Sequence, residues 1–124
     1  MDDVNQLIER YVAMWHESDP QARRAAIAEI WAEDAVDIVR DTTYRGHSRI
    51  EERVASAYER FVGAGEHRFV PHGEVVQRGN GLRFRWQMVT TGDGAVAGAG
   101  CDFIVLGPDG RIAADYQFPE AAAS

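Results

Sequence analysis

Three aspartates interrupt apolar stretches of this sequence, and their carboxyl groups are the side chains best suited to chemistry. Asp37 lies in the stretch 36–39, Asp102 in the stretch 101–105, and Asp115 in the stretch 112–116. A carboxyl group held in an apolar cavity has a raised pKa and can act as a general acid or base. The sequence therefore predicts proton-transfer chemistry wherever these carboxyl groups face a cavity.

Each aspartate also has an ordinary structural interpretation, which the sequence leaves open. Asp37 could be a solvated strand residue, and Asp115 could face outward or pair with an arginine. Asp102 could be the outer-face partner of Arg83 or Arg85 on a neighbouring strand. A shift of one residue would decide whether Asp102 or its neighbour Cys101 faces inward.

Tyr11 and His72 are the remaining catalytic candidates. Tyr11 lies on the buried stripe of a predicted helix, where most tyrosines are packing residues with a satisfied hydroxyl. His72 is the only histidine inside the predicted sheet and could shuttle a proton near neutral pH. Pro71 before it favours a bulge or an edge strand, which would leave His72 exposed.

Composition narrows the classes of function. With 124 residues we expect one domain over 1–120 and a loose tail over 121–124. The net charge of −7 argues against nucleic acid and anionic membranes as partners. The acidic N-terminus is unlike a secretory signal, and the single cysteine, Cys101, fits a reducing, cytoplasmic setting. There is no metal-ligand spacing and no phosphate or dinucleotide fingerprint, so we expect no metal and no cofactor.

The first half of the chain has helical periodicity. Helices are predicted over 4–17 and from Pro20, where Asp19 is the N-cap, followed by a strand over 35–40 and a polar turn. Ser48 and Glu51 form the pattern of a capping box, which predicts the start of a third helix.

From His67 onward, four strand-like runs are separated by three glycine-rich turns at 79–81, 92–94 and 107–110. In the run 82–88, Phe84 and Trp86 alternate with Arg83 and Arg85, so one face meets a core. The order predicts an α+β fold in which three helices pack on a strongly curved, mainly antiparallel sheet and close a cone around an apolar pocket. We expect the pocket to be lined by Trp15, Trp31, Val39, Tyr58, Phe61, Phe84, Trp86, Met88 and Phe118.

Several short segments, taken in order, resemble one known family. They are residues 10–13, 31–35, 44–46 with Ile50, 102–103, 110–112 and Phe118. Together they are similar to the SnoaL-like branch of the nuclear-transport-factor-2-like superfamily, whose members include ketosteroid isomerases, polyketide cyclases, epoxide hydrolases and non-catalytic proteins. The resemblance implies a cone-shaped α+β barrel and a homodimer packed through the outer face of the sheet.

The resemblance also implies roles for individual residues. Tyr11 matches a helix tyrosine that donates to a substrate oxyanion in ketosteroid isomerase, while Val39 occupies the place of that enzyme's base. The isomerase's second acid falls at Cys101, beside Asp102, and Asp115 loosely matches an aspartate of the cyclases. Epoxide hydrolysis in this fold uses two aspartates bridged by an arginine, and the sequence pattern places no arginine inside.

Two functions follow from these observations. The first is an isomerase, cyclase or lyase-type enzyme that moves protons on a small apolar substrate, with Asp115, Asp37 or Asp102 as acid or base and Tyr11 stabilising an oxyanion. The second is a non-catalytic ligand-binding or dimerisation module of the same fold, which the missing base at Val39 favours.

Overall fold

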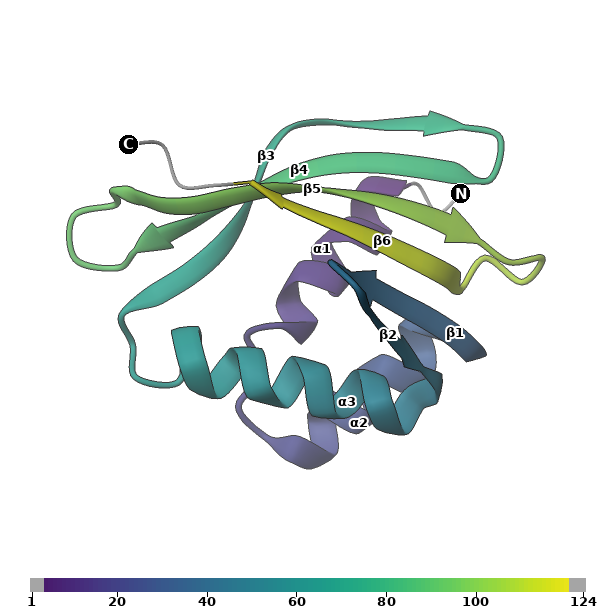
Figure 1. The fold of residues 1–124 in the computed structure, drawn as a ribbon, viewed down its shortest axis with the longest axis horizontal. Coiled ribbons are helices and arrows are strands. Elements are labelled where there is room, and N and C mark those ends of the chain that lie inside the picture. The colour runs from purple at the N-terminus through teal and green to yellow at the C-terminus, as the bar shows by residue number, and fades with distance from the viewer. Residues whose placement is uncertain (1–3, 121–124) are drawn as a thin grey trace.

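The computed structural model describes residues 4–120, in which helices cover one side of a single curved sheet (Figure 1). The expected tail at 121–124 lies outside the described residues. The six strands are ordered β2-β1-β6-β5-β4-β3, and every neighbouring pair is antiparallel except β1 and β6. This arrangement confirms the predicted α+β fold with helices on a curved, mainly antiparallel sheet.

The helical half of the chain holds three helices and two strands. Their bounds are α1 Val4–Met14, α2 Pro20–Ile30, β1 Trp31–Val39, β2 Thr42–Arg45 and α3 Gly46–Ala57, with a π-helical turn, η1 Tyr58–Val62, continuing α3. The remaining strands are β3 His67–Arg78, β4 Gly81–Thr90, β5 Val96–Leu106 and β6 Ile112–Glu120. The three predicted turns do join these four strands.

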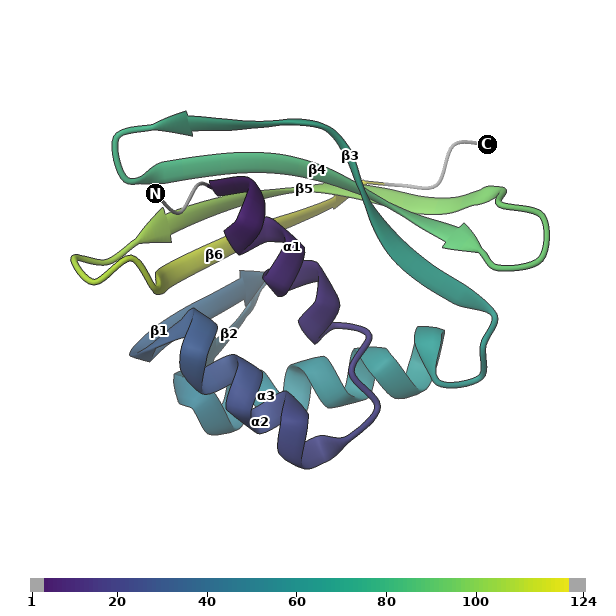
Figure 2. The same ribbon diagram turned by 180° about the vertical axis from the view of Figure 1, so that it is seen from behind.

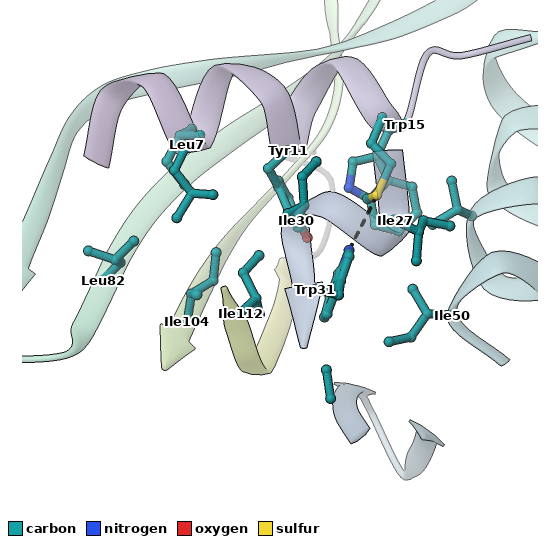
Figure 3. Close-up of a cluster of buried hydrophobic side chains, with 14 of the residues drawn as sticks. Leu7, Tyr11, Trp15, Ile27, Ile30, Trp31, Ile50, Leu82, Ile104 and Ile112 are labelled. Carbon is teal, nitrogen blue, oxygen red and sulfur yellow. Dashed lines mark hydrogen bonds between the residues drawn. The ribbon is translucent and has the colours of Figure 1, made fainter. Parts of the chain in front are cut away.

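Helix α1 lies across the inner side of the sheet, and α2 and α3 pack below it (Figure 2). Leu7, Ile8, Tyr11 and Met14 recur at helical spacing and are all buried on one face of α1. They join residues of α2, α3 and the inner faces of the strands in one apolar core, which Figure 3 shows around Trp31. The Trp31 Nε1 group donates to the Met14 sulfur at 3.3 Å. No helix among the described residues is long and apolar enough to cross a membrane.

Several predicted boundaries were wrong, each for a local reason. Helix α1 ends at Met14, not at residue 17, because the next three amides bond to carbonyls three residues back instead of four. Strand β1 begins at Trp31, not Ala35, because Trp31 follows α2 directly and pairs with Ile112. The polar turn was expected through Asp41 and Thr42, but Thr42 already begins strand β2, which was not predicted and which pairs with β1 through the tight turn at Arg40.

The predicted capping box at the start of α3 was also wrong. The helix begins at Gly46, so Ser48 lies inside it, and no side chain caps its N-terminus. Gly46 adopts a φ of 86°, a left-handed conformation that glycine reaches easily and that turns strand β2 directly into α3. The prediction for α2 was correct: Asp19 accepts a hydrogen bond from the Gln21 amide, and Pro20 is the first residue of the helix.

Candidate functional site

The three aspartates lie on adjacent strands and point to the same, inner face of the sheet. In the parallel pair of β1 and β6, Asp37 is opposite Asp115, and on β5 Asp102 is opposite Gln117 of β6. Side chains of alternate strand residues share a face, so Asp115 and Gln117 both point inward. All three aspartates are at most 1 % exposed.

Tyr11 reaches this group from α1 and lies at its centre. Its hydroxyl is hydrogen bonded to Asp102 Oδ2 at 2.9 Å and to Asp115 Oδ2. Gln117 Nε2 donates to the same hydroxyl oxygen at 3.2 Å. A tyrosine hydroxyl has a single proton to donate, so a second proton, carried by one of the two carboxyl groups, must complete these contacts. Burial first, and then the nearby carboxylates, raise the pKa of Tyr11 well above 10.0, which keeps the hydroxyl protonated.

The surroundings of the two carboxyl groups indicate which of them carries the second proton. Asp102 Oδ1 accepts from Trp86 Nε1 at 2.8 Å, so two neutral donors, Trp86 and Tyr11, stabilise its charged form. Asp115 Oδ1 has no hydrogen-bond partner. Burial and the charge of Asp102 raise the pKa of Asp115 well above 3.8, whereas burial raises the pKa of Asp102 against the hydrogen bonds that lower it. We therefore assign the proton to Asp115 and the negative charge to Asp102.

Arg53 of α3 connects the third aspartate to this network. Its Nη2 donates to Gln117 Oε1 at 2.6 Å, and its Nε lies 3.9 Å from Asp37 Oδ2, an ion pair too long to be a hydrogen bond. Both Asp37 oxygens are buried without a hydrogen-bond partner. Burial raises the pKa of Asp37 to about 7, although Arg53 acts to lower it. Asp37 therefore keeps its proton to a higher pH than an ordinary aspartate does.

A cavity of about 320 Å³ opens next to the network. Tyr11, Asp102, Gln117 and Arg53 give it one polar side. The other walls are mostly apolar, and exposed residues lie at its opening. In full, the lining residues are Tyr11, Val12, Trp15, Arg40, Arg53, Ala57, Arg60, Phe61, Phe69, Phe84, Trp86, Met88, Gly98, Ala99, Asp102, Gln117, Pro119 and Glu120.

The structure brings four of the five catalytic candidates together. Tyr11 and Asp102 line the cavity, and Asp115 and Asp37 lie behind that surface, where they contact Tyr11 and Arg53 respectively. His72 is not part of the group, because it is exposed on the edge strand β3. The choice between Cys101 and Asp102 is resolved as well, since Asp102 faces inward and Cys101 alternates to the other face.

Of the residues expected to line the pocket, five do so and four do not. Trp15, Phe61, Phe84, Trp86 and Met88 line the cavity. Trp31 and Val39 are buried in the interior instead. Tyr58 lies under the Arg23 guanidinium, 5.2 Å from the ring centroid, and faces α2. Phe118 is 57 % exposed on the outer face, because its neighbour Gln117 points inward.

Arg53 and Gln117 are site residues that the sequence pattern did not identify, and Arg53 is the inward arginine that the pattern could not place. Arg53 follows Ile50 by three residues, a spacing that keeps both on one side of the helix. Gln117 follows Asp115 by two residues, so strand alternation already indicated its inward direction. Among the ion pairs of residues 4–120, Arg53 pairs with Asp37 alone, so the arginine-bridged pair of aspartates is not formed here. Within the same residues, no group of three or more His, Cys, Asp or Glu side chains is placed to hold a metal ion.

Comparisons with solved structures agree with the architecture. A "putative isomerase of the SnoaL-like family" from Agrobacterium tumefaciens is 28% identical, with a TM-score of 0.84, and the match covers 94% of this chain and 97% of that one. A "putative polyketide cyclase" from Sinorhizobium meliloti is 19% identical, with a TM-score of 0.69 and coverage of 90% and 93%. A nuclear-transport-factor-2-like protein of unknown function from an Exiguobacterium species is 18% identical, with a TM-score of 0.72 and coverage of 94% and 99%.

Sequence comparison gives the family. No curated protein matches the chain significantly. The family model of the SnoaL-like domain matches residues 8–114, which include Tyr11, Asp37 and Asp102 and end one residue before Asp115. That span is most of the chain, and the chain therefore belongs to the SnoaL-like domain family.

Proposed function

We propose that this protein is an isomerase, cyclase or lyase-type enzyme. The carboxyl groups of its aspartates would transfer a proton from one atom to another of a small, largely apolar substrate. The observation that carries the proposal is the position of Asp102. Its carboxyl group is 1 % exposed, lines an otherwise largely apolar cavity, and accepts hydrogen bonds from two neutral donors, Tyr11 and Trp86. A desolvated carboxylate of raised pKa is a stronger base than one in water.

In the proposed reaction, Asp102 removes a proton from a carbon next to a carbonyl group of the bound molecule. The electron pair of the broken C–H bond moves into the carbonyl, and an enolate oxygen forms. Protonated Asp102 then returns the proton to a different carbon of the delocalised enolate, which completes an isomerisation. In a cyclisation, the enolate carbon instead attacks a second carbonyl carbon of the same molecule, the C=O π bond there breaks, and protonated Asp102 gives its proton to the new alkoxide oxygen. Trp86 and Tyr11 hold the Asp102 carboxyl group in place. Protonated Asp115 donates to the Tyr11 oxygen, which strengthens Tyr11 as a donor.

Similar proteins support a reaction of this type. One solved structure that covers nearly the whole chain is named a "putative isomerase", and another a "putative polyketide cyclase". The alternative is a binding protein of the same fold, which would present a similar cavity without turnover.

Exchange of carbon-bound hydrogen with solvent separates the two functions. We expect the protein to catalyse the exchange of hydrogen for deuterium from D₂O at the carbons beside the carbonyl group of 2-tetralone, a bicyclic ketone. NMR follows the exchange. The D102N variant keeps the shape of the side chain and removes the base, so the rate should fall about 100-fold or more. The matched control is D34N, which removes an exposed aspartate of β1 and should leave the rate unchanged.

Two results would contradict the enzymatic proposal. One is equal deuterium incorporation by D102N and the wild-type protein. The other is incorporation no faster than in buffer while calorimetry shows that 2-tetralone binds in the cavity. The second result would instead support the non-catalytic binding function.

A further inference from the structure

The opening of the cavity differs in charge from the rest of the protein. The chain carries a net charge of −7, yet two arginines, Arg40 and Arg60, line the cavity and are exposed to solvent. Arg40 belongs to the turn between β1 and β2, and Arg60 to the π-helical turn η1. Glu120, the last residue of β6, is the one exposed acidic side chain of this lining. The opening is therefore positive in an otherwise acidic molecule.

The two arginines at the opening are not engaged with the protein's own acids. Within residues 4–120, neither Arg40 nor Arg60 forms an ion pair with a carboxylate. The Arg60 guanidinium lies 5.1 Å from the ring centroid of Phe61, which is itself a wall of the cavity. A positive charge therefore lies next to an apolar wall of the cavity, where a cation is attracted by the face of the aromatic ring. Arg53, deeper inside, is already committed to Gln117 and Asp37.

The interior beyond the opening fits an apolar ring system. Trp15, Phe61, Phe69 and Phe84 supply aromatic walls, and Met88 adds an adaptable one. A volume of about 320 Å³ is at the small end of ligand cavities, which suits a molecule of one or two rings.

We propose that the ligand of this cavity is an anionic amphiphile, a carboxylic acid built on one or two apolar rings. Its rings lie between the aromatic walls, and its carboxylate lies at the opening, where Arg40 and Arg60 bind it. This inference rests on the proposed ligand cavity and adds the substrate class. Asp102, on the polar side of the cavity, then faces the ring system, and the carboxylate serves for binding alone.

The test compares two ligands of nearly equal shape that differ in charge, 2-naphthylacetate and 2-naphthylacetamide, by titration calorimetry. We expect the wild-type protein to bind the acid about tenfold more tightly than the amide, since exposed ion pairs each contribute up to about fivefold. The double variant R40Q/R60Q should bind the two probes equally. The control R83Q removes an exposed arginine on the outer face of β4 and should keep the preference.

Other measurements keep the test decisive. Circular dichroism establishes that the double variant is folded, and the single variants R40Q and R60Q should each lose part of the preference. In the wild-type protein, the preference should shrink as sodium chloride is added. The proposal is overturned if the amide binds as tightly as the acid, if R40Q/R60Q keeps the preference, or if neither probe binds. A preference for the acid in the wild-type protein, with no deuterium exchange into 2-tetralone above the rate in buffer, would keep this inference and reject only the catalytic function.

Discussion

Four side chains of the site that can carry a negative charge lie in an apolar interior, and Arg53 is the positive side chain beside them. Tyr11, Asp102 and Asp115 form one hydrogen-bonded group, and Asp37 has only the distant guanidinium of Arg53. A buried carboxylate without donors is strongly disfavoured, so the folded protein retains protons that the unfolded chain releases. The charge state of the site is therefore coupled to folding.

Asp37 gives this coupling a sign that can be measured. Its pKa rises from 3.8 to about 7 on folding, so between pH 4 and 7 the folded state holds a proton that the unfolded state has lost. The stabilisation is full below the unfolded pKa and is lost as pH rises through 7. We expect the D37N variant, measured by urea unfolding, to gain about 2–3 kcal/mol relative to the wild type between pH 5 and pH 8.

The control for this prediction is D34N, which removes an exposed carboxylate from the same strand. Its free energy of unfolding should stay parallel to that of the wild type across the same range. A D37N curve that also remains parallel would mean that Asp37 is charged in the folded protein at every pH tested.

At the level of elements, strands β4 and β5 position Asp102 through a glycine. Trp86 on β4 is opposite Gly100 on β5, and a Cβ atom added at Gly100 would lie 2.2 Å from Trp86 Cζ2. The indole therefore lies against the bare Cα of Gly100, and from there its Nε1 reaches Asp102 Oδ1 at 2.8 Å. The absence of a side chain at Gly100 thus lets the opposite Trp86 direct its Nε1 group to Asp102, two residues along β5.

A methyl group at Gly100 should displace this tryptophan. We expect G100A to lower the free energy of unfolding by about 1–3 kcal/mol, the usual cost of overpacking, and to reduce deuterium exchange with 2-tetralone. The control G98A lies on the same strand, where an added Cβ would be 3.5 Å from the flexible Met88 Cε, an ordinary contact. Equal stability of G100A and G98A in urea unfolding would show that the indole is not held against Gly100.

The sequence predicted those strands whose signals are local, and it missed the features that depend on pairing between distant segments. Glycine turns and strict alternation identified β3 to β6, since both signals are local. The short strand β2 was missed because four residues carry little periodicity, and its strand conformation comes from pairing with β1. The inward aspartates could be proposed one at a time from alternation, but their meeting at Tyr11 depends on the register of β1, β5 and β6. Arg53 was missed because a charged residue beside an apolar helix stripe usually reaches solvent.

Considered as a whole, the molecule has two apolar surfaces on opposite sides of one sheet. The inner one forms the core and cavity, and the outer one is exposed over β5 and β6. Phe103, Tyr116 and Phe118 project there, with 44 %, 38 % and 57 % of their surfaces exposed. Phe103 is opposite Tyr116 in the strand register, and their ring centroids are 6.5 Å apart. Contiguous exposed aromatic side chains are characteristic of interaction sites.

We propose that two copies of the chain pair through this outer face, which matches the dimer that the family resemblance implies. The wild-type protein should sediment at about twice the 13.8 kDa mass of the chain. F118E places a charge within the aromatic patch and should yield monomers, because an unpaired charge buried at an interface is costly. A25E, which adds the same charge on the exposed side of α2, should leave the dimer intact.

Since the cavity lies on the opposite side of the sheet, monomeric F118E should still bind 2-naphthylacetate with the affinity of the wild type. A wild-type protein that sediments as a monomer would exclude this interface, and a monomer that has lost binding would show that the two faces are not independent.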